Sequence, residues 1–351
     1  MDNKMFETVR RANLIDPWNN DSVISEQRTR FVVPVNQPLV LISEVQRSGG
    51  TLLTQLLDQH PQLHVHPSEL HIGRPNKRFW PKLNLELSAD DWFDQLWEHP
   101  ALLHARDGYS KPGKYSHATL PFLFLGTLQK QLFKQLLEEK SVQSQRDILD
   151  AYATSYFNAW LDYAGLYRDP KTVKYWVTFV ARVSFDPDNI TGFFSDYPDG
   201  YFVSVVRDPV SWFASASRYM PEVYGNVEEA CNLWHHSTER ALAEFQSRPE
   251  KVFLVSFEQL VANSFEIINN LCDFLNISPI ASIDCIRPTF NGMPISSNSS
   301  FDTSNYTVLQ NSLDRSKYLA DDLICYIRQY CGELHEDAMA LIASLGPIRR
   351  K

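Results

Sequence analysis

Residues 38–59 read PLVLISEVQRSGGTLLTQLLDQ and hold the pattern that decides the fold. The apolar run 38–45 has the length of a buried strand, and from residue 51 the apolar spacing changes to that of a helix, which Pro61 ends. Gly49 and Gly50 lie between the two patterns. The segment therefore predicts a strand, a tight turn and a helix.

Further strands are predicted where short apolar stretches are rich in β-branched or aromatic residues, at 63–66, 171–179, 201–206 and 251–256. A helix should start at Asp208-Pro209, because Asp is a good N-cap and Pro suits the first helical position. Another should be capped by Ser264 and run to Leu275. Strands that alternate with helices predict an α/β fold, with a central parallel sheet flanked by helices.

Between residues 84 and 165 the pattern is helical only, with helices predicted at 91–99, 125–139 and 146–165. We interpret 84–165 as a helical insertion that shapes an acceptor site, within a domain spanning 31–351, and 1–30 as an N-terminal extension. The aromatic residues of the insertion either form its core or contact a ligand. A long polar loop at 278–312 precedes predicted helices at 316–332 and 335–344.

Composition narrows the classes of function. The net charge of −9 argues against a nucleic-acid polymer or an anionic membrane as partner, because both reward a basic surface. Five scattered cysteines without CxxC spacing indicate neither a disulfide framework nor a zinc site. No apolar run reaches the length of a membrane span, and the N-terminal residues lack a signal-peptide pattern. We expect a cytoplasmic protein with no membrane span, and the sequence leaves its oligomeric state open.

The turn at Gln46-Arg47-Ser48-Gly49-Gly50-Thr51-Leu52-Leu53 is a candidate anion site. The two glycines permit a turn in which successive N–H groups point at one anion, and the following helix adds its positive end. Arg47 supplies a charge, and Ser48 and Thr51 supply hydroxyl groups. An ordinary glycine turn is the alternative. The loop lacks the GxxxxGK[ST] pattern and its lysine, which argues against a kinase or ATPase.

A second candidate anion site is the stretch VVRDPVSWFAS at residues 205–215, where a predicted strand passes into a helix. Ligands of open α/β sheets collect at such strand ends. Arg207 lies at the end of the strand and Ser215 about two helical turns further on, so both could contact one phosphate. The alternative is a salt bridge of Arg207 at the helix start, with Ser215 as a small buried residue.

With both motifs in view, the chain resembles the family of sulfotransferases that depend on 3'-phosphoadenosine-5'-phosphosulfate (PAPS), particularly its carbohydrate and Golgi-type branch. RSGGTLL resembles the family's 5'-phosphosulfate loop, and VVRDPVSWFASASRY resembles its 3'-phosphate motif. VFLVSFEQLVANSFEIINNLCDFLNI resembles the strand and helix that follow. The resemblance covers roughly residues 38–72 and 170–276.

The resemblance implies a P-loop nucleotide-binding type of α/β fold, with PAPS as sulfuryl donor and no metal. It implies a small-molecule or carbohydrate acceptor. The 5'-phosphosulfate would be held by Arg47, Ser48, Gly49, Gly50, Thr51 and Leu52, and the 3'-phosphate by Arg207 and Ser215.

Catalysis should require stabilisation of charge on the leaving oxygen, for which Arg47 is the candidate, and a base that takes the acceptor's proton. The segment HVHPSELH at 64–71 follows a predicted strand. Glu69 resembles the family's acidic residue in this region and is the candidate base, with His71 and His66 as alternatives. A metal site is disfavoured, because His64 and His66 have no obvious third ligand nearby.

Two further basic residues could contact the transferred sulfate. Lys174 stands where related enzymes often carry a lysine, although the usual proline is missing, and Arg182 is a second possibility. Two other functions remain open. A P-loop kinase of a small molecule would consume ATP with magnesium, and a non-catalytic nucleotide-binding protein would not depend on Glu69.

Overall fold

The computed structural model describes residues 28–70, 79–97, 124–139, 141–160, 163–290, 292–294, 297–298, 301–302 and 313–344. They fall into two compact units, one within residues 1–36 and 82–170 and one within residues 37–81 and 171–351. None of the helices in these ranges combines the length and the apolar character that a bilayer crossing requires.

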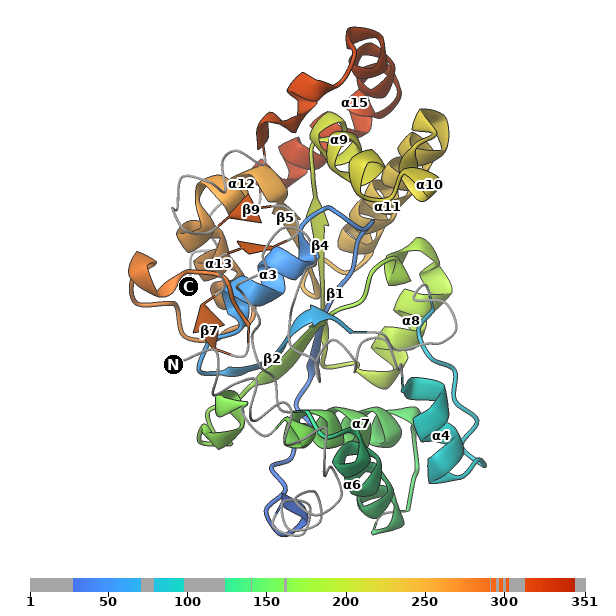
Figure 1. The fold of residues 1–351 in the computed structure, drawn as a ribbon, viewed down its shortest axis with the longest axis vertical. Coiled ribbons are helices and arrows are strands. Elements are labelled where there is room, and N and C mark those ends of the chain that lie inside the picture. Colours follow the sequence, from blue (N-terminus) through green and yellow to red (C-terminus); the bar gives the residue numbers. More distant parts are fainter. Residues whose placement is uncertain are drawn as a thin grey trace, which may run out of the picture. The chain divides into compact units, whose positions relative to one another are not determined.

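The larger unit is built on a five-stranded sheet, in the order β2-β3-β1-β4-β5 (Figure 1). All neighbouring strands are parallel. The predicted α/β fold with a central parallel sheet is therefore confirmed, and the carboxyl ends of the five strands lie at one edge of the sheet. The strands are β1 (Leu39–Ile42), β2 (Leu63–Glu69), β3 (Tyr175–Phe179), β4 (Tyr201–Val206) and β5 (Val252–Ser256).

Helices cover both faces of this sheet. On one face, alternate strand residues such as Val40, Val177 and Val203 share an apolar cluster with α3 (Gly50–Leu57), α12 (Phe257–Ala262) and α13 (Ser264–Phe274). On the other face, Trp176 of β3 packs against Tyr197, which ends α8 (Pro187–Asp196). Helices α11 (Val227–Ser247) and α15 (Asp321–Ser344) contact β5. Burial on both faces explains the continuous apolar runs of the strands.

The helix after β4 starts as predicted. Asp208 accepts the N–H of Ser211 at 2.7 Å, and Pro209 is the first residue of α9 (Pro209–Tyr219). A short helix, α10 (Pro221–Tyr224), follows directly.

Two other helix predictions are wrong. Ser264 is the first helical residue of α13 and not its cap, because Asn263, which directly follows α12, is the N-cap. The predicted helices 316–332 and 335–344 are, from Asp321 on, one helix, α15. It continues through Gly332 because packing against α9 and α11 outweighs the weak helix propensity of glycine.

The smaller unit contains α4 (Ala89–Leu96), α6 (Gly126–Glu138) and α7 (Gln145–Ala159). Ser88 and Ser144 form capping boxes with Asp91 and Asp147, which fix the starts of α4 and α7. Aromatic rings fill the space between the helices, and the side chains of Phe93, Phe133, Tyr152, Tyr156 and Trp160 are all buried. These aromatic residues of the predicted insertion therefore form a core.

The remaining described elements are short. They are the 3-10 helices η1 (Ala164–Tyr167), η2 (Val183–Phe185), η3 (Ile283–Cys285) and η4 (Leu313–Tyr318), and the strands β6 (Thr289–Phe290), β7 (Met293–Pro294), β8 (Ser297–Asn298) and β9 (Phe301–Asp302). The strands β6 to β9 form two antiparallel pairs inside the predicted 278–312 loop.

Candidate functional site

The loop between β1 and α3 makes a sharp turn. Arg47 and Gly49 both have positive φ angles, of 77° and 130°. The N–H of Ser48, which lies between them, donates to the carbonyl of Val45 at 3.3 Å. A Cβ atom at Gly49 would lie 2.6 Å from the ring of Phe257. Only glycine fits this position, because its φ angle and its close approach to the ring both exclude a side chain.

The loop ends at the N-terminus of α3. Gly50 starts the helix, and the side chain of Thr51 is half-buried. Ser48 is almost fully buried. The side chain of Leu52 is buried in the apolar cluster beneath the helix, so only its backbone N–H could contact a ligand. The unsatisfied N–H groups of a helix N-terminus favour an anion, so the predicted first anion loop has suitable geometry.

The second predicted loop contacts the first. Arg207, directly after β4, is almost fully buried, and its Nη1 donates to the carbonyl oxygen of Arg47 at 2.9 Å. Its Nε and Nη2 donate to the hydroxyl of Ser211, at 3.3 and 3.0 Å. The guanidinium also stacks on the ring of Phe257, 4.2 Å from the ring centre. Arg207 therefore joins the ends of β1, β4 and β5.

Helix α9 brings the other predicted residues to the same place. Ser215 lies on this helix and is buried. The guanidinium of Arg47 lies over the ring of Tyr219, the last residue of α9, at 4.3 Å from the ring centre. The indole of Trp212 donates to the carbonyl of Gln46 at 2.9 Å. The first loop thus lies along α9, the helix that carries Ser215.

Arg182 is a third cation at this edge. It follows β3, has a φ angle of 64°, and donates its backbone N–H to the carbonyl of Glu44 at 3.0 Å. Its buried guanidinium donates from Nη2 to the hydroxyl of Tyr224, which in turn donates to Oε1 of Gln46 at 2.7 Å. Lys174, by contrast, precedes β3 and is exposed at the opposite edge of the sheet. Of the two basic residues considered, only Arg182 lies at the carboxyl edge.

Glu69 is the last residue of β2 and so ends at the same edge. Burial raises the pKa of the Tyr224 hydroxyl, Arg182 lowers it, and smaller opposing effects come from Glu69, which raises it, and Arg47, which lowers it. The charges of Glu69, Arg47 and Arg182 therefore all act on one hydroxyl group. The alternative base His71 lies outside the described residues.

The histidines before Glu69 are buried. Nε2 of His60 hydrogen-bonds to the carbonyl of Ser278 at 2.8 Å, and its Nδ1 accepts the N–H of Gln62 at 3.2 Å. His64 and His66 are buried on β2. No group of three metal-ligating side chains was found within the described part of the chain.

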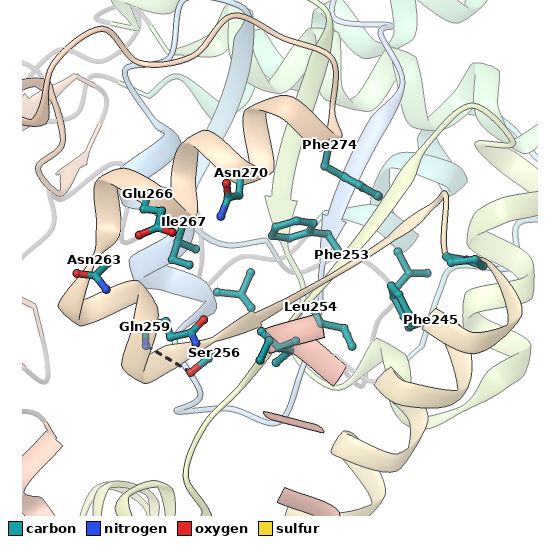
Figure 2. A pocket seen from close by; sticks show the side chains of 15 residues that line it. Phe245, Phe253, Leu254, Ser256, Gln259, Asn263, Glu266, Ile267, Asn270 and Phe274 are labelled. Carbon is teal, nitrogen blue, oxygen red and sulfur yellow. Dashed lines mark hydrogen bonds between the residues drawn. The ribbon is translucent and has the colours of Figure 1, made fainter. Parts of the chain in front are cut away.

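A cavity of about 480 Å³ opens along β5 (Figure 2). Its walls come from β5, α12, α13 and the last turns of α11 and α15, and most of its lining is apolar, including Phe245, Phe253 and Phe274. None of the predicted site residues lines it, so it is separate from the two anion loops.

A family model described as the sulfotransferase family matches residues 38–279, which include both loops. The chain belongs to the sulfotransferase family. Solved structures that are similar to this sulfotransferase have low sequence identity. The sulfotransferase domain of the Synechococcus PCC 7002 olefin synthase is 19% identical, with 85% of this chain and 96% of that chain covered and a TM-score of 0.45.

For the sulfotransferase domain of the curacin biosynthetic pathway the identity is 19%, the coverage 76% and 82%, and the TM-score 0.42. For the sulfotransferase from Alicyclobacillus acidocaldarius the identity is 15%, the coverage 88% and 97%, and the TM-score 0.42. No curated protein matches the chain.

Sequence reasoning missed several residues that shape the candidate site. Phe257 could have been found, because it directly follows a predicted strand and so had to lie at the carboxyl edge. Tyr224 gave no signal, since it lies 178 residues from the Gln46 side chain that it contacts. Glu44 was read as part of the apolar strand 38–45, whereas β1 ends at Ile42.

Proposed function

We propose that this sulfotransferase transfers a sulfuryl group from PAPS to a hydroxyl group of a small molecule or carbohydrate. The observation that carries the proposal is the hydrogen bond between the Arg207 guanidinium and the Arg47 carbonyl, because it joins the two anion loops. A nucleotide with a phosphosulfate at one end and a 3'-phosphate at the other needs two neighbouring anion sites.

In this proposal the first loop holds the 5'-phosphosulfate, through Arg47, the hydroxyls of Ser48 and Thr51, and the backbone N–H groups of Gly49, Thr51 and Leu52. Gly50, whose N–H donates to Glu44, contributes the close approach of a backbone without a side chain. Arg207 and Ser215 hold the 3'-phosphate. The ring of Phe257 lies between the two loops, against both Gly49 and Arg207, and is placed to limit where the nucleotide lies.

The reaction would move one sulfuryl group in line. The acceptor oxygen forms a bond to sulfur while the bond from sulfur to the phosphate oxygen breaks, and adenosine 3',5'-bisphosphate leaves. Arg47 stabilises the charge that develops on the leaving oxygen, and Arg182 supplies a second cation at the same edge. Glu69 takes the proton of the acceptor hydroxyl, with His71 and His66 as the alternative bases.

Calorimetry with adenosine 3',5'-bisphosphate tests the nucleotide site. We expect Arg47→Ala and Arg207→Ala each to weaken binding about 10- to 100-fold, since each removes a charged hydrogen-bonding group. Arg328→Ala, on the exposed side of α15, is the matched control and should bind as the wild type does. A wild-type protein that binds ATP with magnesium and not the bisphosphate would support the kinase alternative instead.

A turnover assay tests whether the protein catalyses sulfuryl transfer. With PAPS and a panel of glycans, phenols and other hydroxyl compounds, sulfated product should appear in mass spectrometry. Glu69→Gln should retain the nucleotide and lose about 10²–10⁴-fold in rate. A Glu69→Gln variant with unchanged turnover would exclude Glu69 as the base.

A further inference from the structure

An acidic side chain lies beneath the first anion loop. Glu44 is almost fully buried, and its Oε1 accepts the N–H of Gly50 at 2.8 Å. A Cβ atom at Gly50 would lie 2.5 Å from that oxygen, so the carboxyl group occupies the space beside the helix start. The first N–H of α3, which an anion would be expected to attract, is thus held by a carboxyl group of the protein.

The environment of Glu44 favours its neutral form. Burial raises its pKa well above the ordinary value, and the negative charge of Glu69 raises it further, against the effect of hydrogen bonds from the N–H groups of Gly50 and Val205. Within the described residues, no ion pair joins Glu44 to a cation.

The second loop offers an instructive contrast. Glu258 accepts the N–H of Asp208 at 3.0 Å, and burial raises its pKa also. The positive charge of Arg207 lowers the pKa of Glu258, whereas no cation lowers the pKa of Glu44. An ionised Glu44 would therefore be a buried and uncompensated negative charge next to the first loop.

Charged groups from several elements surround the first loop, and two of the cations donate hydrogen bonds to groups other than Glu44. The guanidinium of Arg182 donates to Tyr224, and that of Arg207 donates to the Arg47 carbonyl and to Ser211. The charged and titratable groups at this edge of the sheet are Glu69 at the end of β2, Arg47 in the loop itself, Arg182 after β3, Arg207 after β4 and Tyr224 on α10, and the charge of Glu69 acts on the pKa of Glu44.

We propose that Glu44 is a proton-sensitive positioning residue of the first loop, which admits the phosphosulfate while Glu44 is neutral and disfavours it once Glu44 is ionised. The neutral carboxyl holds the Gly50 N–H and so fixes the start of α3 without opposing an anion. The ionised carboxyl places a negative charge one hydrogen bond away from the same anion. This inference rests on the proposed function, since it concerns the site proposed for the PAPS phosphosulfate.

The expected consequence is a loss of nucleotide affinity as the pH rises. If only the neutral form binds, the affinity for adenosine 3',5'-bisphosphate falls about tenfold for each pH unit above the pKa of Glu44. Ionisation of the nucleotide's phosphates has the opposite effect, because it raises the affinity as the pH rises. The phosphates are fully ionised about one to two pH units above their last pKa of about 6. The alkaline side of the profile is therefore the informative one.

The test is calorimetry with adenosine 3',5'-bisphosphate from about pH 6 to about pH 9, on wild type, Glu44→Gln and Glu244→Gln. Glu44→Gln keeps a neutral side chain of nearly the same shape and should retain the low-pH affinity while losing the alkaline decline. Glu244, on α11, also has a pKa raised by burial but is paired with Arg248, so Glu244→Gln should follow the wild type.

Parallel profiles for wild type and Glu44→Gln would overturn the inference, and so would a folded Glu44→Gln protein without affinity at any pH. A second measurement needs no variant. Wild-type binding at alkaline pH, compared in buffers of different ionisation enthalpy, should show proton uptake, and its absence would also overturn the inference. A wild type that binds no bisphosphate at any pH would instead refute the proposed function.

Discussion

The replacement Gly49→Ala tests how tightly the first loop is constrained. Gly49 has a φ angle of 130°, and an added Cβ would lie 2.6 and 3.1 Å from two ring atoms of Phe257. The unfavourable φ angle costs about 1–2 kcal/mol for a residue with a Cβ. Crowding a well-packed site costs about 1–3 kcal/mol more. We therefore expect the free energy of unfolding to fall by about 2–5 kcal/mol.

Urea denaturation followed by tryptophan fluorescence measures this loss. The two costs separate in a double-mutant cycle, since Phe257→Leu removes the ring that the new methyl group would meet. In the Phe257→Leu protein, Gly49→Ala should lower the free energy of unfolding only by the contribution of the unfavourable φ angle, about 1–2 kcal/mol.

Gly332→Ala is the matched control. Gly332 lies inside α15, and a Cβ there would meet no atom within 4 Å. The replacement should raise the free energy of unfolding by about 1 kcal/mol, because alanine is the better helix former. Two results would contradict the close approach of the first loop to the Phe257 ring. One is a Gly49→Ala protein as stable as the wild type, and the other is an equal loss of unfolding free energy with and without the ring.

Two further predictions concern the groups around the loop. Tyr224→Phe removes the hydroxyl that accepts from Arg182 and donates to Gln46. Because a buried guanidinium then loses its acceptor, the free energy of unfolding in urea titrations should fall by about 1–3 kcal/mol. Unchanged stability would show that this hydrogen bond contributes nothing. For Glu44 the folded pKa lies above the ordinary value of 4.5, so between the two the native state holds the extra proton and wild-type stability falls as the pH rises. Glu44→Gln lacks this slope, and thermal unfolding at several pH values should show wild type losing stability relative to it above about pH 4.5; equal slopes would contradict the burial of an ionisable group at this position.

The sequence by itself determined the local elements of this sulfotransferase. A continuous apolar run followed by two glycines and a helical spacing predicts a buried strand, a turn and a helix, and Asp208-Pro209 favours the start of a helix. Alternation of such elements also determined the parallel sheet, because parallel strands need helical connections. The strands, turns and helices themselves depend on neighbouring residues alone.

Only the tertiary structure decided which distant side chains meet. Arg182 donates to Tyr224, 42 residues further along the chain, and Tyr224 donates to Gln46, 178 residues before it. The contact from Arg207 to the Arg47 carbonyl joins residues 160 apart, and no local pattern contains such a separation. The continuous α15 has the same cause, since packing against other helices, and not propensity, carries it through Gly332.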